Sequence, residues 1–348
     1  MSGEMPASQP PGSWEWAVCG ASVTGSEHQR RGLGCDDAYS YGVAGDFIVA
    51  AVADGAGSVT GTSALGSYAA CQRVLADAMK RRFINEYHGA AVAEREAMMR
   101  RLFERAAEHV RLEADALGMD TALLSTTLCV AIADRQGATF GQIGDGIIAT
   151  ESDDQATTLL VEAKDEYANA TWFIQSDGAF ETAYRSATHL GPTAFALSTD
   201  GMSYKITNVA TGEAYQPFFR GSWEHVRSGV SSANFTALLR GIEDDQTGDD
   251  KTMVLAALQW QDDQFHPSAR PDQQLRVSSA QPPLPTVRNV APHDDSSQME
   301  LEPASADWAI AIPAIDETDA ATPSEAVTDE LPSSSRGGRR RLIRRRPT

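Results

Sequence analysis

The sequence contains little cysteine, and its four cysteines form no CxxC pair. They are far apart and have mostly small or apolar neighbours, as is typical of free thiols buried as small hydrophobic side chains: Cys19, Cys35, Cys71 and Cys129. A zinc site would need paired spacings, and a secreted disulfide scaffold would be shorter and richer in cysteine. The cysteine content therefore indicates a protein of the reducing cytoplasm.

Long apolar runs are also missing. No stretch approaches the roughly 20 apolar residues of a membrane-spanning helix, and the first sixteen residues lack the basic and apolar regions of a signal peptide. Basic residues are in the minority, 29 against 48 acidic ones, which gives a net charge of -19. This balance argues against a general nucleic-acid binder. It fits a solvated acidic surface or a carboxylate cluster for hard cations.

Lysine is absent from residue 261 onward, where eleven of the sixteen prolines lie. Residues 289–335 include acidic side chains but no Lys or Arg, and an arginine cluster follows at 336–346. Such a composition cannot bury enough apolar surface to offset chain entropy. We therefore expect three parts: a disordered lead-in over 1–12, a folded domain over 13–260, and a disordered tail over 261–348.

Two pieces of this tail stand out, the apolar island ADWAIAIPAI at 306–315 and the arginine cluster. An apolar island in a disordered segment is typical of a piece that folds onto a partner or back onto its own domain. We expect the tail to dock on an acidic protein surface, with a merely solubilising tail as the alternative.

The folded region predicts helices and strands in an order that sets its class. Helical spacing of apolar residues covers 61–83, 91–118 and 231–241. Strand patterns cover 47–54, 123–134, 138–145, 146–152, 171–177, 193–200 and 251–258. Strands do not alternate one for one with helices, so the predicted class is α+β with antiparallel sheets. Short turns within 123–152 predict hairpins.

Aspartates stand at the ends of several predicted strands. Asp54, Asp145 and Asp200 each end an apolar run and precede a glycine, and Asp249 comes just before the last strand. Antiparallel neighbours bring such ends together, and carboxylate oxygens suit Mg²⁺ or Mn²⁺ better than zinc. A single Asp-Gly pair is more often only a turn, as we expect at Asp177. The order of the flanking motifs must therefore decide.

Six short motifs occur in a fixed order: CDDAY (35–39), VADGAGS (52–58), STTLCVA (125–131), GQIGDG (141–146), LSTDG (197–201) and DDKTMV (249–254). Over residues 16–259 this set resembles the protein phosphatase 2C class of metal-dependent Ser/Thr phosphatases, in a bacterial-type subgroup. The resemblance implies an αββα sandwich, in which two antiparallel sheets pack face to face between helices. It also implies hydrolysis of phosphoserine and phosphothreonine on proteins by a water activated between two Mn²⁺ or Mg²⁺ ions.

The resemblance assigns metal ligands position by position. Asp54 matches the carboxylate that bridges both metals, and the Gly55 carbonyl matches a ligand of the second. Asp200 and Asp249 match further ligands of the first metal. Asp249 is preferred over Asp250 because the motif places the ligand three residues before a threonine, here Thr252.

Three further acids match positions around this site. Asp37 matches a residue that contacts the metals directly or through water, and Asp36 stands beside it at a related position. Asp145 matches an aspartate that holds a third metal, with a simple turn residue as the alternative.

Two departures from the family pattern concern the substrate. Ala56 stands where many relatives have a histidine that protonates the leaving alkoxide. His28 is a candidate substitute, and a structural histidine is the alternative. The phosphate-binding arginine of the family falls on Gly32, so the neighbouring Arg31 is the candidate for that role.

Two other functions stay open. A pseudophosphatase would bind a phosphoprotein or a kinase without turnover, as the missing histidine favours and the complete ligand set disfavours. A calcium-binding domain would carry a DxDxDG loop, which the sequence lacks. For a phosphatase, the expected partners are phosphoproteins, namely a Ser/Thr kinase or its targets.

Overall fold

The computed structural model describes residues 12–56, 61–161, 171–208, 210–242, 247–262 and 276–279. Most of the predicted lead-in and tail therefore lies outside the described residues. The helical elements are α1 (Ser26–Arg31), α2 (Ser63–Ala78), α3 (Arg81–Gly89), α4 (Val92–Leu117), η1 (Thr121–Leu124), α5 (Ala179–Thr182), η2 (Asp200–Met202), α6 (Ser203–Ile206), α7 (Gln216–Arg227) and α8 (Ser232–Gly241).

The strands form two antiparallel sheets. The first has the order β1-β10-β9-β6-β7 and the second β11-β2-β3-β4-β5-β8. Their bounds are β1 (Gly12–Val23), β2 (Ala38–Ala44), β3 (Phe47–Ala53), β4 (Leu128–Ala133), β5 (Gly137–Ile143), β6 (Ile147–Ser152), β7 (Gln155–Leu159), β8 (Arg185–Leu190), β9 (Ala194–Ser198), β10 (Lys251–Asp262) and β11 (Arg276–Ser279).

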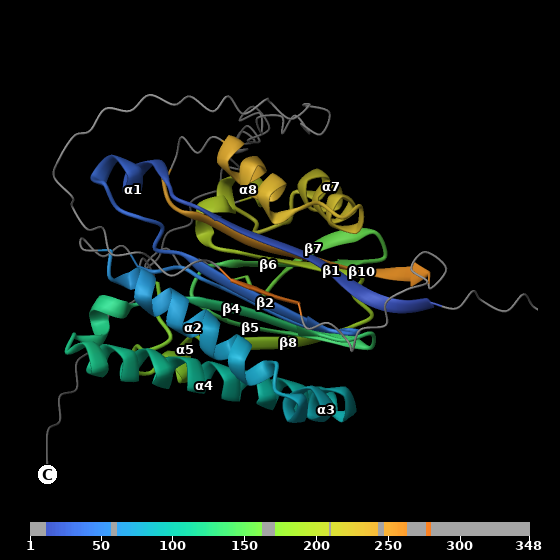
Figure 1. Ribbon diagram of the computed structural model, residues 1–348, viewed down its shortest axis with the longest axis horizontal. Coiled ribbons are helices and arrows are strands. Elements are labelled where there is room, and N and C mark those ends of the chain that lie inside the picture. Colours follow the sequence, from blue (N-terminus) through green and yellow to red (C-terminus); the bar gives the residue numbers. More distant parts are fainter. Residues whose placement is uncertain are drawn as a thin grey trace, which may run out of the picture. The chain divides into compact units, whose positions relative to one another are not determined.

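The two sheets stack face to face, with helices on both outer faces (Figure 1). α7 and α8 pack on the first sheet, and α2 and α4 pack on the second. This arrangement confirms the predicted α+β class and the αββα sandwich. Each sheet must bury both faces, so its central strands are apolar throughout, as in the seven buried residues of β3.

Two apolar layers hold the sandwich together. Between the sheets, Trp16 and Phe195 from the first sheet meet Ile48 and Phe140 from the second. Below the second sheet, α2 and α4 contribute buried apolar side chains such as Cys71, Val74, Met99 and Phe103. α4 ends at Gly118, whose left-handed backbone (φ 66°) allows the amide of Met119 to reach the carbonyl of Ala114.

The helix predicted over 61–83 is two helices. α2 ends at Ala78, and Lys80 takes an extended backbone before α3 begins at Arg81. The break allows Tyr87 to bury its ring and donate a hydrogen bond from its hydroxyl to the carbonyl of Ile132 at 2.7 Å. This tertiary contact has no signature in the local spacing of apolar residues.

The predicted hairpin between 138–145 and 146–152 is wrong. β5 pairs with β4 and β8 in the second sheet, whereas β6 pairs with β7 and β9 in the first. The short segment 144–146 therefore crosses from one sheet to the other. The strand predicted at 171–177 is also wrong, because this segment is a loop whose Ile174 amide donates to the carbonyl of Thr126.

Strand pairing continues beyond residue 260, where the predicted folded domain ends. β10 runs to Asp262 along the whole of β1, and β11 pairs with β2 as the edge strand of the second sheet. β11 lies within the segment expected to be disordered. The described elements all belong to one compact unit, residues 1–299.

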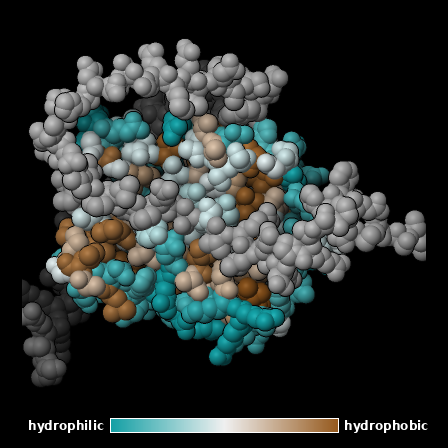
Figure 2. Space-filling view, viewed as in Figure 1, coloured by the Kyte–Doolittle hydropathy of each residue, from teal (hydrophilic) through white to brown (hydrophobic). Residues whose placement is uncertain are grey.

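Some large apolar side chains remain on the surface. Leu112, Leu117 and Leu123, from the end of α4 and from η1, are each more than 40% exposed. Figure 2 shows a hydrophobic area at the lower left, over the end of the molecule where α4 finishes. Within the described part of the chain, no helix has the length and apolar character needed to cross a membrane.

Candidate active site

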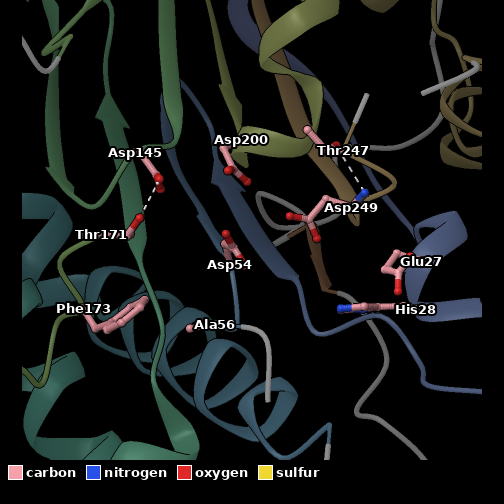
Figure 3. A pocket seen from close by; sticks show the side chains of 10 residues that line it. All are labelled: Glu27, His28, Asp54, Ala56, Asp145, Thr171, Phe173, Asp200, Thr247 and Asp249. Atoms are coloured by element: carbon pink, nitrogen blue, oxygen red, sulfur yellow. Dashed lines mark hydrogen bonds between the residues drawn. The ribbon is translucent and has the colours of Figure 1, made fainter. Parts of the chain in front are cut away.

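A recess of about 280 Å³ opens where several strands of both sheets end (Figure 3). Its side chains come from segments far apart in the sequence, which the two sheets bring to one end of the sandwich. Described residues lining it are Glu27, His28, Asp54, Ala56, Asp145, Thr171, Phe173, Asp200, Thr247 and Asp249.

Three of the predicted aspartates meet in this recess. Asp54 follows β3, Asp145 lies in the crossing from β5 to β6, and Asp200 follows β9. Each offers a carboxylate oxygen, and these oxygens all lie within 4.8 Å of one another. Asp249 lines the same recess just before β10, which runs antiparallel to β9. The convergence follows from antiparallel pairing, which places the end of one strand beside the start of the next.

Two threonines at the start of β4 fix the backbone of Asp54. The hydroxyl of Thr126 and the amide of Thr127 donate to the Asp54 carbonyl at 3.0 and 2.9 Å. The amide of Asp54 in turn donates to the hydroxyl of Thr127 at 3.0 Å. With its backbone polar groups engaged on one side, Asp54 directs its carboxylate into the recess.

The position of Asp145 depends on the crossing between the sheets. Gly144 has φ 106°, a backbone conformation that residues other than glycine rarely adopt. The loop wrongly predicted as a strand supplies Thr171, whose hydroxyl donates to Oδ2 of Asp145 at 2.8 Å. The same loop places Phe173 in the recess. Asp145 is thus both part of the segment that crosses between the sheets and a candidate ligand.

Asp249 and Asp250 have different surroundings. Asp249 faces the recess, whereas Asp250 is buried and accepts the amides of Gly25 at 2.7 Å and Asp36 at 2.6 Å. Gly201 packs so closely that a Cβ there would lie 2.0 Å from the Asp250 carbonyl oxygen. This packing keeps the ends of β9 and β10 together and leaves Asp249 as the acid of the pair that is exposed to the recess.

The carboxylates raise one another's pKa. Burial first, and then the charges of Asp200 and Asp249, raise the pKa of Asp54 well above its usual range. Burial and the charges of Asp145 and Asp249 raise the pKa of Asp200 to about 7. Burial and the charge of Asp54 also raise the pKa of Asp37. Such mutual repulsion is relieved when a cation binds among the oxygens.

The remaining predicted residues lie at different distances from the recess. Asp37 is buried behind it and accepts the hydroxyl of Thr199 at 2.7 Å. Asp36 is buried, accepts the hydroxyl of Ser63 at 2.7 Å and is not among the described residues that line the recess. Gly55 forms a bridge to Thr126, and a Cβ there would lie 2.4 Å from the Asp36 carbonyl oxygen. Arg31 is exposed at the end of α1 and does not line the recess.

Sequence reasoning missed the hydroxyls that hold the acids. Thr127, Thr171 and Thr199 each bond a candidate ligand or its backbone. Thr127 and Thr199 lie inside the motifs STTLCVA and LSTDG. The motifs marked these positions, but the sequence did not indicate what the two hydroxyls do. Thr171 lies outside every motif, and only the three-dimensional structure brings it to Asp145.

The sequence profile described as "Protein phosphatase 2C" matches residues 24–240, which is more than half of the chain. The chain belongs to the protein phosphatase 2C family. It is therefore one of the protein serine/threonine phosphatases, whose family cofactors are Mn²⁺ and Mg²⁺. No curated protein matches the sequence.

Solved structures similar to this family member include bacterial phosphatases. A bacterial serine phosphatase is 14% identical, with a TM-score of 0.48, and the match covers 69% of this chain and 96% of that one. The catalytic domain of the serine/threonine protein phosphatase PstP with two manganese ions is 15% identical, with a TM-score of 0.45 and coverage of 71% and 99%. PstP/Ppp of Mycobacterium tuberculosis is 16% identical, with a TM-score of 0.42 and coverage of 70% and 98%.

The donor set of the recess fits the family's metals. Asp54, Asp145, Asp200 and Asp249 offer only carboxylate oxygens, which Mg²⁺ and Mn²⁺ prefer, and no cysteine lines the recess among the described residues. The crowding of four acids, with no Lys or Arg among the described lining residues, calls for positive charge from outside the protein.

Proposed function

We propose that this protein hydrolyses phosphoserine and phosphothreonine on proteins with two divalent cations bound in the recess. The observation that carries the proposal is the meeting of Asp54, Asp145 and Asp200 within 4.8 Å at the end of the sandwich, with Asp249 beside them. Two cations in such a site lower the pKa of a shared water and neutralise charge on the phosphoryl group.

Different residues of the recess would hold different cations. Asp54 would hold both cations, Asp200 and Asp249 would hold the first, and the carbonyl of Gly55 would hold the second. Asp37 orients the site from behind, itself held by Thr199. Asp145, whose carboxylate lies within 4.8 Å of those of Asp54 and Asp200, would hold a third, weaker cation.

Asp36 and Arg31 have weaker support. The carboxylate of Asp36 is engaged by Ser63 and lies outside the lining of the recess. Arg31 would have to swing from an exposed position to reach a phosphate. We therefore keep the metal ligands as the centre of the proposal and assign neither residue a necessary role.

The pseudophosphatase remains the second candidate because of one observation. Ala56 lines the recess and offers no proton to a leaving group. A protein that bound phosphorylated side chains without turnover would need the same acids and cations, but no acid for the leaving oxygen.

A metal-titrated assay separates the two candidates. After treatment with a chelator, the wild type should hydrolyse p-nitrophenyl phosphate and a phosphothreonine peptide only when Mn²⁺ or Mg²⁺ is returned, and zinc should not replace them. Asp54→Asn, Asp200→Asn and Asp249→Asn should each abolish this activity with circular dichroism unchanged. Asp177→Asn, an exposed Asp-Gly turn outside the recess, is the control and should remain active.

Equal activity in the wild type and Asp54→Asn would overturn the assignment of ligands. Metal binding with no hydrolysis of either substrate would favour the pseudophosphatase.

The proposal extends to the substrate and the cellular compartment. We propose a phosphoprotein substrate, either a Ser/Thr kinase or one of its targets. The four cysteines are free, and three of them are fully enclosed, which suits the reducing cytoplasm. The tail segments proposed to dock on a protein lie outside the described residues.

A further inference from the structure

Among the described residues that line it, the recess has many acids and one side chain able to carry positive charge. Five of its ten described lining residues are Asp or Glu, and none is Lys or Arg. His28 is the exception, and it lies across the recess from Ala56 (Figure 3). Apart from the carboxylates, which would be engaged by cations, it is the one ionisable side chain in the described lining.

His28 lies beside a buried carboxylate. Its Nδ1 lies 2.9 Å from Oδ2 of Asp250, and both side chains are less than 10% exposed. The two amides that Asp250 also accepts, from Gly25 and Asp36, prevent the carboxylate from turning away. Nδ1 faces Asp250, and the outer edge of the imidazole ring points into the recess, with a nitrogen at its tip.

The helix that carries His28 is fastened to the candidate metal ligands. The amide of Glu27 donates to the carbonyl of Gly248 at 2.9 Å, and Gly25 packs so tightly that a Cβ would lie 2.3 Å from the Asp249 backbone. The α1 helix therefore cannot shift without moving the segment that contains Asp249. This attachment gives the imidazole a fixed place relative to the acids.

Cleavage of a phosphoserine or phosphothreonine releases an alkoxide, which is a poor leaving group without a proton. We propose that His28, oriented by Asp250, donates that proton from Nε2. The proposal rests on the function proposed above. As the oxygen of water bonds to phosphorus and one proton of that water passes to solvent, the bond from phosphorus to the side-chain oxygen breaks and its electron pair stays on that oxygen. The oxygen takes the Nε2 proton, and solvent returns a proton to the imidazole.

A purely structural histidine would explain the contact with Asp250 equally well, so the test must separate the two ring nitrogens. His28→Asn places an amide near the position of Nδ1, which keeps a donor for Asp250 but leaves nothing at the tip. His28→Gln places an amide near the tip, which can donate a hydrogen bond but cannot give up a proton. His109→Asn, on the remote helix α4, is the matched control.

The measurement compares two leaving groups in the Mn²⁺-loaded full-length protein. For both His28 variants, kcat on a phosphothreonine peptide should fall by about 100-fold or more. Turnover of p-nitrophenyl phosphate, whose phenolate leaves without a proton, should change little. Mn²⁺ affinity by calorimetry and the melting temperature should match the wild type, and His109→Asn should behave as wild type throughout.

Each other outcome is decisive. Equal losses on both substrates, or no loss on the peptide, would overturn the role of His28 while the proposed phosphatase function stands. A His28→Asn variant that loses Mn²⁺ affinity or melts earlier would show a structural role instead. If the wild type cleaves neither substrate with Mn²⁺ bound, the proposed function fails and this role fails with it.

Discussion

Thr199 shows how strongly the carboxylate cluster depends on single hydroxyl groups. Its hydroxyl donates to Oδ2 of Asp37 at 2.7 Å and accepts the amide of Thr252 at 3.1 Å. Both bonds are buried, so neither can be exchanged freely for bonds to water. Through this one atom, the end of β9 is tied to β10 and to an acid behind the recess.

Thr199→Val should therefore destabilise the protein despite its similar shape. Valine leaves a buried amide and a buried carboxylate each short of one partner, which costs about 1–3 kcal/mol. The free energy of unfolding, measured in urea, should fall by that order. Thr236→Val removes a hydroxyl that bonds only within α8, to the carbonyl of Ser232, and should have little effect. Equal stability of the two variants would contradict the role given to Thr199.

The residues of the recess were more predictable from the sequence than most other features. Asp54, Asp145, Asp200 and Asp249 stand at the ends of apolar runs, and all four line one recess. A resemblance to a family supplied their roles, which geometry alone does not test. The partnership of His28 with Asp250 could not be predicted, because the two residues are more than 200 positions apart and belong to no shared pattern.

At the scale of elements, the contact between α2 and η1 is set by one glycine. A Cβ at Gly66 would lie 2.0 Å from the carbonyl oxygen of Leu124. α2 also carries Ser63 and Ser67, whose hydroxyls donate to Asp36. The close approach of α2 to η1 therefore helps to fix Asp36, which lies next to Asp37 in the sequence.

Gly66→Ala should lower the melting temperature, because the helix or the loop must move to admit the methyl group, at a cost of about 1–3 kcal/mol. Gly89→Ala is the matched control, since nothing lies within 4 Å of a Cβ at the end of α3. Alanine there should be neutral or stabilise the helix by up to about 1 kcal/mol. Thermal unfolding followed by circular dichroism compares the pair, and a stable Gly66→Ala would disprove the tight packing.

Strands and long helices were predictable where the period of apolar residues is strong. The prediction for 91–118 matches α4 within a residue at each end, and that for 47–54 matches β3 closely. The hairpin predicted around 144–146 was wrong, because a hairpin and a crossing between sheets both need a short glycine-containing turn. The two differ only in which strands pair with β6, and that is decided by distant segments.

At the scale of the whole molecule, β11 changes where the folded part ends. The strand pairs with β2 through residues 276–279 and forms the edge of the second sheet. A sequence rich in proline and acidic residues predicted no structure there. Pairing with an existing sheet edge demands little from the added strand itself, so its composition is a poor guide.

A chain ending at residue 260 should fold but melt earlier than one ending at residue 299. The shorter chain loses β11 and the end of β10, and so leaves the backbone of β2 unpaired at the edge. Mn²⁺-dependent hydrolysis of p-nitrophenyl phosphate should survive in both, since no described residue lining the recess lies beyond 260. Equal melting temperatures would show that β11 adds no stability.

The proposal as a whole depends on cations bridged by Asp54, and calorimetric titration of Mn²⁺ into the metal-free protein tests this most directly. The wild type should bind two Mn²⁺ ions per chain tightly, with any third binding more weakly. Asp54→Asn should lose tight binding of both, because one carboxylate serves both positions, whereas Asp177→Asn should bind as the wild type does. No tight Mn²⁺ binding by the wild type, or unchanged binding by Asp54→Asn, would contradict a two-cation phosphatase centred on this residue.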